Sequence, residues 1–272
     1  MRTLKNDDGS PPNVSDVRVH LRIKDQEAPL CIPISEAEPE LLADSGLPWR
    51  TSRWLFGYEY HSGAYYSATT STQVIYESRL QLRCLILADF DPSVTFIVAQ
   101  PFQLHATVDG ARRHYVPDYF LTTTSGPVVL DVAPSERRSS PRSRDTYAWM
   151  RIALATRQWT LDVISEPPPA FFHNVHMLAG CRRCPVTLHT ALTQLRSLNL
   201  IGMTIGEAIA CVDGERDIAY AALMQLLWTH YVSVDLNARI HDDTFLVASD
   251  CCDVDLPSGS ATDCPASEGK CP

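Results

Sequence analysis

The chain has 272 residues, of which 45% are hydrophobic and 20% charged, and its formal net charge is −9. This composition fits a soluble globular protein, and no apolar run reaches the roughly 18 residues that a membrane-spanning helix needs. The acidic balance argues against a large non-specific nucleic-acid surface, because phosphate binding depends on Lys and Arg. The polar N-terminus lacks the apolar core of a secretory signal, so we expect a cytoplasmic protein with no membrane partner.

The first predicted region is a mostly irregular arm over residues 1–69, which are rich in proline and polar side chains. An α/β domain is predicted over residues 70–165. Residues 72–90 place apolar side chains three and four positions apart, which predicts a helix with one buried face. Asp91-Pro92 should end this helix, because a proline disfavours helical backbone in the residue before it.

Strands dominate the next stretch. Residues 94–108 predict a strand that is interrupted at Gln100-Pro101, because a proline inside a strand implies an edge or a bulge. A second strand is predicted over residues 114–124, and a third, apolar enough to be central and buried, over 128–133. The domain is completed by a helix over 144–158 and a strand over 159–165. The predicted fold class is therefore α/β.

A second part should follow residues 166–170, a stiff proline-rich linker. Its patterns predict three helices and then a short β-hairpin, which together suggest a winged-helix-like α+β domain over 170–249. The second helix should begin with a capping box, in which Thr204 is the N-cap and Glu207 follows three residues later. The predicted helices span 185–199, 204–211 and 217–231, and the hairpin strands span 231–236 and 239–247.

Several cysteines lie in the C-terminal part of the chain. Cys181 and Cys184 form a lone C-x-x-C pair, which would need two further ligands, such as nearby histidines, to make a structural zinc site. Four more cysteines lie in a tail over 250–272 that is rich in Asp, Ser, Gly and Pro, and this tail is predicted to be disordered.

Acidic residues near the ends of two neighbouring strands suggest a metal site. Asp118 follows Pro117, whose missing N–H breaks the strand, and Asp131 ends the next strand. Glu77 on the preceding helix could supply a third carboxylate, and Mg²⁺ prefers a few carboxylates together with water. The spacing alone also fits an ordinary hairpin in which Asp118 lies in a turn, so both interpretations stay open.

The ordered set of motifs resembles TnsA-like transposon endonuclease subunits over about residues 70–250. The matching features are Glu77, Asp-Phe-Asp-Pro at 89–92, Gln100-Pro101, Tyr-x-Pro-Asp at 115–118, and Asp-Val-x-Pro at 131–134. None of these motifs is specific alone, and their order and spacing carry the resemblance.

The resemblance implies a restriction-endonuclease-like fold of the PD-(D/E)xK type, with a mixed sheet flanked by helices. It implies a DNA endonuclease that uses Mg²⁺ (or Mn²⁺) to nick the 5′ ends of a transposon. Its partners would be DNA, a DDE-type transposase and an ATP-dependent regulator. Glu77, Asp118 and Asp131 would be the catalytic and metal-binding residues, and the Val132 carbonyl could also bind the metal.

The chain departs from this family where the site lysine is expected, because Ala133 stands there. Arg137 or Arg138 could replace the lysine as a stabilising charge, although arginine is a poor general base. The metal alone could activate water, or the subunit could have lost cleavage and kept an architectural role in the transposase complex. A further alternative is a winged-helix DNA-binding regulator with an α/β sensor domain.

An arginine-rich stretch over residues 135–145 follows the Asp131 strand directly. It is either a solvated loop or a local surface that binds DNA phosphates. Its candidate DNA-binding residues are Arg137, Arg138, Arg142 and Arg144.

Overall fold

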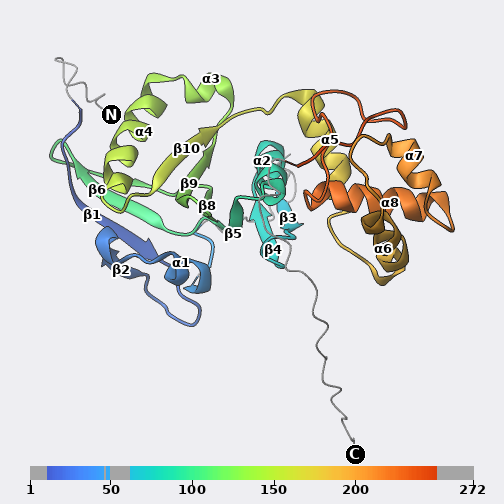
Figure 1. The fold of residues 1–272 in the computed structure, drawn as a ribbon. Coiled ribbons are helices and arrows are strands. Elements are labelled where there is room, and N and C mark those ends of the chain that lie inside the picture. The colour runs from blue at the N-terminus through green and yellow to red at the C-terminus, as the bar shows by residue number, and fades with distance from the viewer. Residues whose placement is uncertain (1–10, 46, 50–61, 250–272) are drawn as a thin grey trace, which may run out of the picture.

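Two four-stranded sheets form the N-terminal part of the protein, seen in a computed structural model that describes residues 11–45, 47–49 and 62–249 (Figure 1). The first sheet has the order β2-β1-β6-β7, and the second has the order β10-β9-β8-β5. A separate hairpin pairs β3 with β4. The strands are β1 (Val14–Leu21), β2 (Leu30–Pro33), β3 (Gly63–Tyr66), β4 (Gln73–Tyr76), β5 (Val94–Ala99), β6 (Gln103–Val108), β7 (Ala111–Tyr115), β8 (Tyr119–Thr123), β9 (Gly126–Val132) and β10 (Thr160–Ile164).

The N-terminal region is more ordered than its composition predicts. Strand β1 pairs antiparallel with both β2 and β6, so it completes the first sheet. Its Val19 and Leu21 are fully buried, because alternate side chains of a strand point to one face. A 3-10 helix, η1 (Ile34–Glu36), and α1 (Pro39–Ser45) follow. The expected irregular arm therefore contains strands from Val14 onward, and residues 1–10, 46 and 50–61 of it lie outside the described residues.

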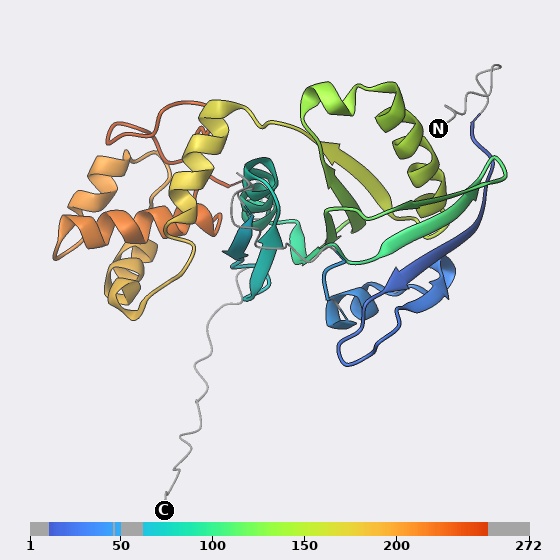
Figure 2. The same cartoon turned by 180° about the vertical axis from the view of Figure 1, so that it is seen from behind.

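The second sheet is mixed, and helices pack on both of its faces (Figures 1 and 2). Strand β9 lies between β10, which is parallel, and β8, which is antiparallel. Val129 faces one core with α4 (Pro141–Ala155), and Leu130 faces the other with α2 (Arg79–Phe90). The prediction of a central buried strand is confirmed, and so is the α/β class.

The helix predicted over 72–90 is shorter than expected. Residues Gln73–Tyr76 form β4 and pair with β3, and the helix begins only after Ser78, whose side chain accepts the Gln81 N–H. The prediction of helix before Ser78 is wrong, because the β-branched and aromatic residues of β4 pair with the aromatic strand β3, which precedes them in a hairpin. Glu77 therefore lies in the β4–α2 connection and not on the helix.

Two proline-containing breaks carry the chain between the two sheets. Gln100-Pro101 separates β5 from β6, and Val116-Pro117-Asp118 separates β7 from β8. Gln100 adopts a left-handed backbone with φ of 48°, and its N–H donates to the Asp118 carbonyl oxygen at 2.8 Å. The predicted interruption at Gln100-Pro101 is confirmed, and the continuous strand predicted over 114–124 is divided at Pro117.

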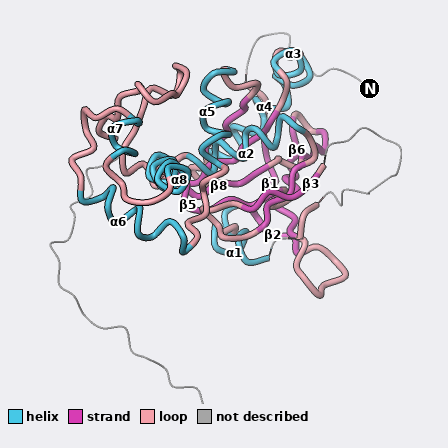
Figure 3. Tube along the Cα trace, turned by 90° about the vertical axis from the view of Figure 1, so that its right-hand side faces the viewer, coloured by secondary structure: helices cyan, strands magenta, loops and turns pink. Residues whose placement is uncertain are grey.

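Helices form the C-terminal part, which Figure 3 shows beside the strands rather than among them. The capping box of Thr204 and Glu207 is confirmed. The predicted hairpin is not formed as paired strands: the structure has only isolated bridges there, such as Ser233 with Val247. Helix α5 was not predicted from the sequence, and it starts at Pro169, inside the expected linker. The helices here are α5 (Pro169–Ala179), η2 (Val186–Leu188), α6 (His189–Ser197), α7 (Ile205–Ala210) and α8 (Arg216–Trp228).

Across the described ranges, every helix is too short or too polar to cross a membrane. The predicted disordered tail over 250–272 lies outside the residues that the structure describes.

Candidate functional site

Asp118 and Asp131 lie together at the ends of adjacent strands. Both are buried, with 6% and 2% of their surface exposed. One carboxylate oxygen of Asp118 accepts the Val132 N–H at 2.8 Å, so this side chain reaches the residue next to Asp131. The break at Pro117 makes this possible, because the chain turns there from the first sheet into the second.

Two tyrosines hold the Asp131 carboxylate. Tyr115, at the end of β7, donates its hydroxyl to both oxygens at 2.9 Å, and Tyr147 on α4 donates to Oδ2 at 2.7 Å. Burial, the Asp131 charge and these hydrogen bonds raise the pKa of both phenols far above the ordinary value. Both tyrosines therefore stay protonated and serve as hydrogen-bond donors to the carboxylate.

The α2 side chain that reaches this site is an amide. Gln81 donates from Nε2 to Asp118 Oδ1 at 2.8 Å, and its Oε1 accepts the Glu77 backbone N–H at 2.5 Å. Ser78, Arg79, Leu80 and Gln81 match the S-x-x-Q signature of a helix start, which could have revealed Gln81 from sequence. The helix thus presents Gln81, and Glu77 enters the network through its backbone.

Ala133 directly follows β9 and is 1% exposed. Its N–H donates to the Ile164 carbonyl oxygen at 3.0 Å, which fixes the backbone against β10. A methyl group here offers neither charge nor hydrogen bond to the two carboxylates. A lysine at this position would have to carry its ammonium group out of a packed core.

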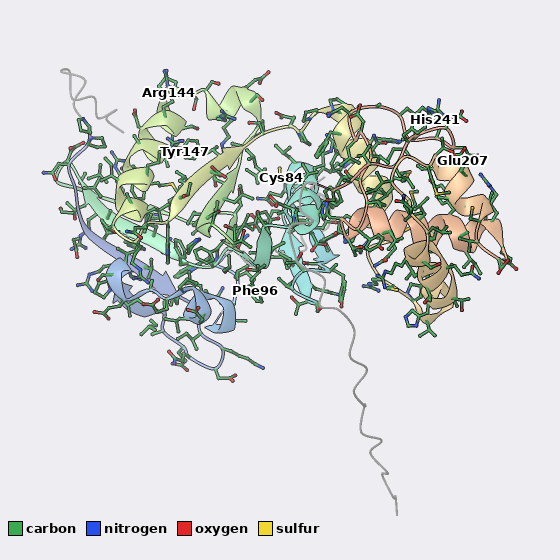
Figure 4. The ribbon with its side chains drawn as sticks, viewed as in Figure 1. Cys84, Phe96, Arg144, Tyr147, Glu207 and His241 are labelled. Atoms are coloured by element: carbon green, nitrogen blue, oxygen red, sulfur yellow. The ribbon has the colours of Figure 1, made fainter. Side chains whose placement is uncertain are left out.

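Cys84 on α2, labelled in Figure 4, is a further buried group, and its thiol lies within reach of the Asp118 charge. Burial, with the Asp118 charge second, raises the pKa of its thiol to about 12. The thiol therefore stays protonated near neutral pH, and it is not an activated nucleophile.

This donor set fits a divalent metal poorly. Mg²⁺ binds hard oxygen ligands, and here an amide stands where a third carboxylate would be useful. Over the described ranges, no group of three or more His, Cys, Asp or Glu side chains is arranged to hold a metal ion. Binding of Mg²⁺ or Mn²⁺ through Glu77, Asp118, Asp131 and the Val132 carbonyl stays a prediction, and we derive no catalytic step through it.

A pocket of about 510 Å³ lies beside this network. It is lined by residues from α3 (Ser135–Arg138), α4 and β10. Figure 4 shows Arg144 and Tyr147 on α4, close to α3 and β10. Three of the lining side chains are guanidinium groups, so the pocket is strongly basic. The lining residues are Arg138, Ser139, Arg144, Tyr147, Arg151 and Val163.

The predicted DNA-binding arginines only partly coincide with the residues that line this pocket. Arg138 and Arg144 line it, whereas Arg137 and Arg142 do not. Arg151 was missed because it lies outside the arginine-rich stretch, about two turns beyond Arg144 on α4. Arg144, Tyr147 and Arg151 are separated by three and four positions, the spacing that places side chains on one face of a helix.

The arginines between Cys181 and Cys184 have a structural role. Arg182 and Arg183 lie over the rings of Tyr65 and Tyr66, at 4.7 and 4.0 Å from the ring centres. Burial raises the pKa of the Cys181 thiol, which disfavours the thiolate that zinc requires. The two arginines thus connect the segment after α5 to the β3–β4 hairpin. This geometry gives no support to a zinc site at Cys181 and Cys184.

No protein-family model matches the chain, and no curated protein matches it. The likeness to TnsA-like subunits therefore stays a prediction from the ordered motifs.

Proposed function

We propose that this chain is a DNA-binding, TnsA-like subunit of a heteromeric transposase, and that its nuclease-like core has an architectural role and does not cut. The observation that carries the proposal is the altered site: Gln81 and the buried Ala133 stand where a metal-dependent nuclease would need a carboxylate and a lysine. The remaining carboxylates are engaged by protein donors, which stabilise the fold.

The finer fold assignment is part of this proposal. A mixed sheet with helices on both faces supports a restriction-endonuclease-like core. The helices after residue 169 would form the winged-helix-like part, with a wing reduced to isolated bridges. The partners would be transposon-end DNA, a DDE-type transposase and an ATP-dependent regulator, and the complex would act in the cytoplasm.

The test is a nicking assay with labelled transposon-end DNA, the transposase of the same element, and Mg²⁺ or Mn²⁺. We expect the wild-type chain to bind the DNA without nicking it. Metal-dependent nicking by the wild type that disappears in Asp118→Ala would overturn the proposal. Asp118→Ala also serves as the control for a contaminating nuclease.

A restoration experiment sharpens the same test. The variant Gln81→Glu with Ala133→Lys returns both missing groups, whereas each single change returns one. We expect nicking only in the double variant, because a proton-transfer group is commonly worth a factor of about 10² to 10⁴ in rate. Urea unfolding of every variant shows whether the buried lysine is tolerated, and Gln81→Glu alone should fold normally.

A second function has one observation in its favour. Asp118 accepts the N–H of Val132, the residue that directly follows Asp131, so the two carboxylates belong to neighbouring positions of adjacent strands. A slow metal-dependent endonuclease would use this pair, and the Asp118→Ala comparison described above distinguishes it from the architectural role.

A further inference from the structure

We propose that Arg138, Arg144 and Arg151 form a binding track for consecutive phosphates of duplex DNA. This inference rests on the proposed DNA-binding function and deepens it by naming the residues that hold the DNA backbone. The three guanidinium groups line one pocket, together with Tyr147 of the Asp131 network. A DNA strand seated there would pass directly beside the altered nuclease site.

The three arginines have no ion-pair partner within the described part of the chain. The ion pairs found there involve other cations, such as Arg157 with Glu38 and Arg216 with Asp242. Glu136 and Asp145 lie in the same stretch but do not line the pocket. Three exposed cations in one concave surface repel one another, and an anion with several oxygens relieves that repulsion.

The spacing of the arginines fits a backbone better than a single small anion. Arg144 and Arg151 are seven positions apart on one helix, which separates them by about 10 Å along its axis. Phosphates of one DNA strand follow one another at about 3.4 Å along the duplex axis, so a duplex lying along α4 would place about three of them over this distance. Arg138 on α3 adds a third point at the side of the same pocket.

The chemistry of the site suits phosphate recognition. Arginine presents a planar fork of N–H donors that matches phosphate oxygens. The chain as a whole carries a net charge of −9, so attraction of DNA must come from a local surface of this kind. Because backbone contacts carry no base information, the pocket would position the DNA and leave sequence recognition to other surfaces.

The experiment measures the affinity of the full chain for duplex DNA across a salt series. Each phosphate contact contributes about 0.9 to the slope of log affinity against log salt for a duplex. We therefore expect Arg144→Ala and Arg151→Ala each to lower that slope by about 0.9, and to weaken binding roughly tenfold at about 0.05 M salt. Arg112→Ala is the control, since Arg112 is an exposed arginine on β7 and lies outside the pocket.

The possible outcomes separate this inference from the proposed function. If the wild type binds DNA but Arg144→Ala and Arg151→Ala change the slope no more than Arg112→Ala, the pocket inference is wrong and DNA binding stands. If the wild type shows no salt-dependent DNA binding, both fail. Arg151→Lys, which keeps the charge, should retain the slope, and a loss as large as that of Arg151→Ala would contradict the electrostatic explanation. Inorganic phosphate that competes as well as a duplex would show a small-anion site instead and would overturn the proposal.

Discussion

Asp89 and Asp131 are both buried carboxylates, yet different kinds of donors hold them. Asp89, which is 5% exposed, accepts hydrogen bonds from Tyr65, from Ser67, and from the backbone N–H groups of Ala68 and Thr69. Asp131 accepts only side-chain hydroxyl groups among its described hydrogen bonds, from Tyr115 and Tyr147.

The difference separates a structural carboxylate from one that belongs to a site. The donors of Asp89 come from one short segment, and two are backbone groups whose positions the β3–β4 turn fixes. The donors of Asp131 come from two distant elements, β7 and α4, and one of them also lines the basic pocket. We expect Asp89 to be more important for stability and the Asp131 network to tolerate change one donor at a time.

The largest effect is expected for Asp89→Asn. The new amide group would place N–H donors against at least one existing donor, and removing a charge from a buried network typically costs about 3 kcal/mol. The free energy of unfolding, measured by urea denaturation, should fall by about that amount. Asp91→Asn is the control, because Asp91 is exposed and its carboxylate accepts the N–H of the nearby Ser93 at the surface; it should cost under about 1 kcal/mol.

Asp131→Asn should cost less, about 2 kcal/mol, because two rotatable hydroxyl groups can adjust to an amide. The same denaturation experiment measures it. A loss equal to or greater than that of Asp89→Asn would remove the distinction between the two carboxylates.

Tyr115→Phe and Tyr147→Phe each remove one donor and should each lower the free energy of unfolding by about 1 kcal/mol. Both hydroxyl groups reach Asp131 Oδ2, so their effects should couple. A double-mutant cycle measures that coupling, which we expect to be at least about 0.5 kcal/mol. Strict additivity would show that the tyrosines act independently.

The smallest expected effect is a difference between the wild type and the Phe variants in how far alkaline pH lowers the free energy of unfolding. Burial and the Asp131 charge raise the pKa of Tyr115 and Tyr147, so the folded chain keeps protons that the unfolded chain releases near its ordinary tyrosine pKa of about 10. The unfolded state then binds fewer protons, and the free energy of unfolding falls as the pH rises above about 10. The Phe variants should show a shallower fall in urea midpoint between about pH 9 and pH 11. A fall as steep as that of the wild type would show that these phenols are not the cause.

Local patterns predicted the parts of the fold that local chemistry determines. The apolar run of β9, the α4 helix and the capping box at Thr204 all have signals within a few residues. The start of α2 was misplaced because β4 depends on pairing with β3, which the sequence does not display. Strand β1 was missed for the same reason, since its partner β6 lies far along the chain.

The candidate site, like the fold, was predictable only where its residues are close in sequence or joined by one hairpin. Asp118 and Asp131 could be placed together because one hairpin brings their strands into contact. Gln81 was open to prediction through the S-x-x-Q signature at the helix start, but the wrong helix boundary hid it. Tyr147 and Arg151 could not be predicted, because only the packing of α4 on the sheet brings them to the site.

The pairing of β1 with β6 has a consequence for synthesis of the protein. Val14 pairs with Val108, so the first strand leaves the ribosome roughly 90 residues, or about 5 to 20 seconds, before its central partner exists. During that interval its apolar alternate residues and unpaired backbone groups are exposed to other nascent chains and to chaperones. Closing so long a loop is also entropically slow, so the first sheet should complete folding only after β6 has been made.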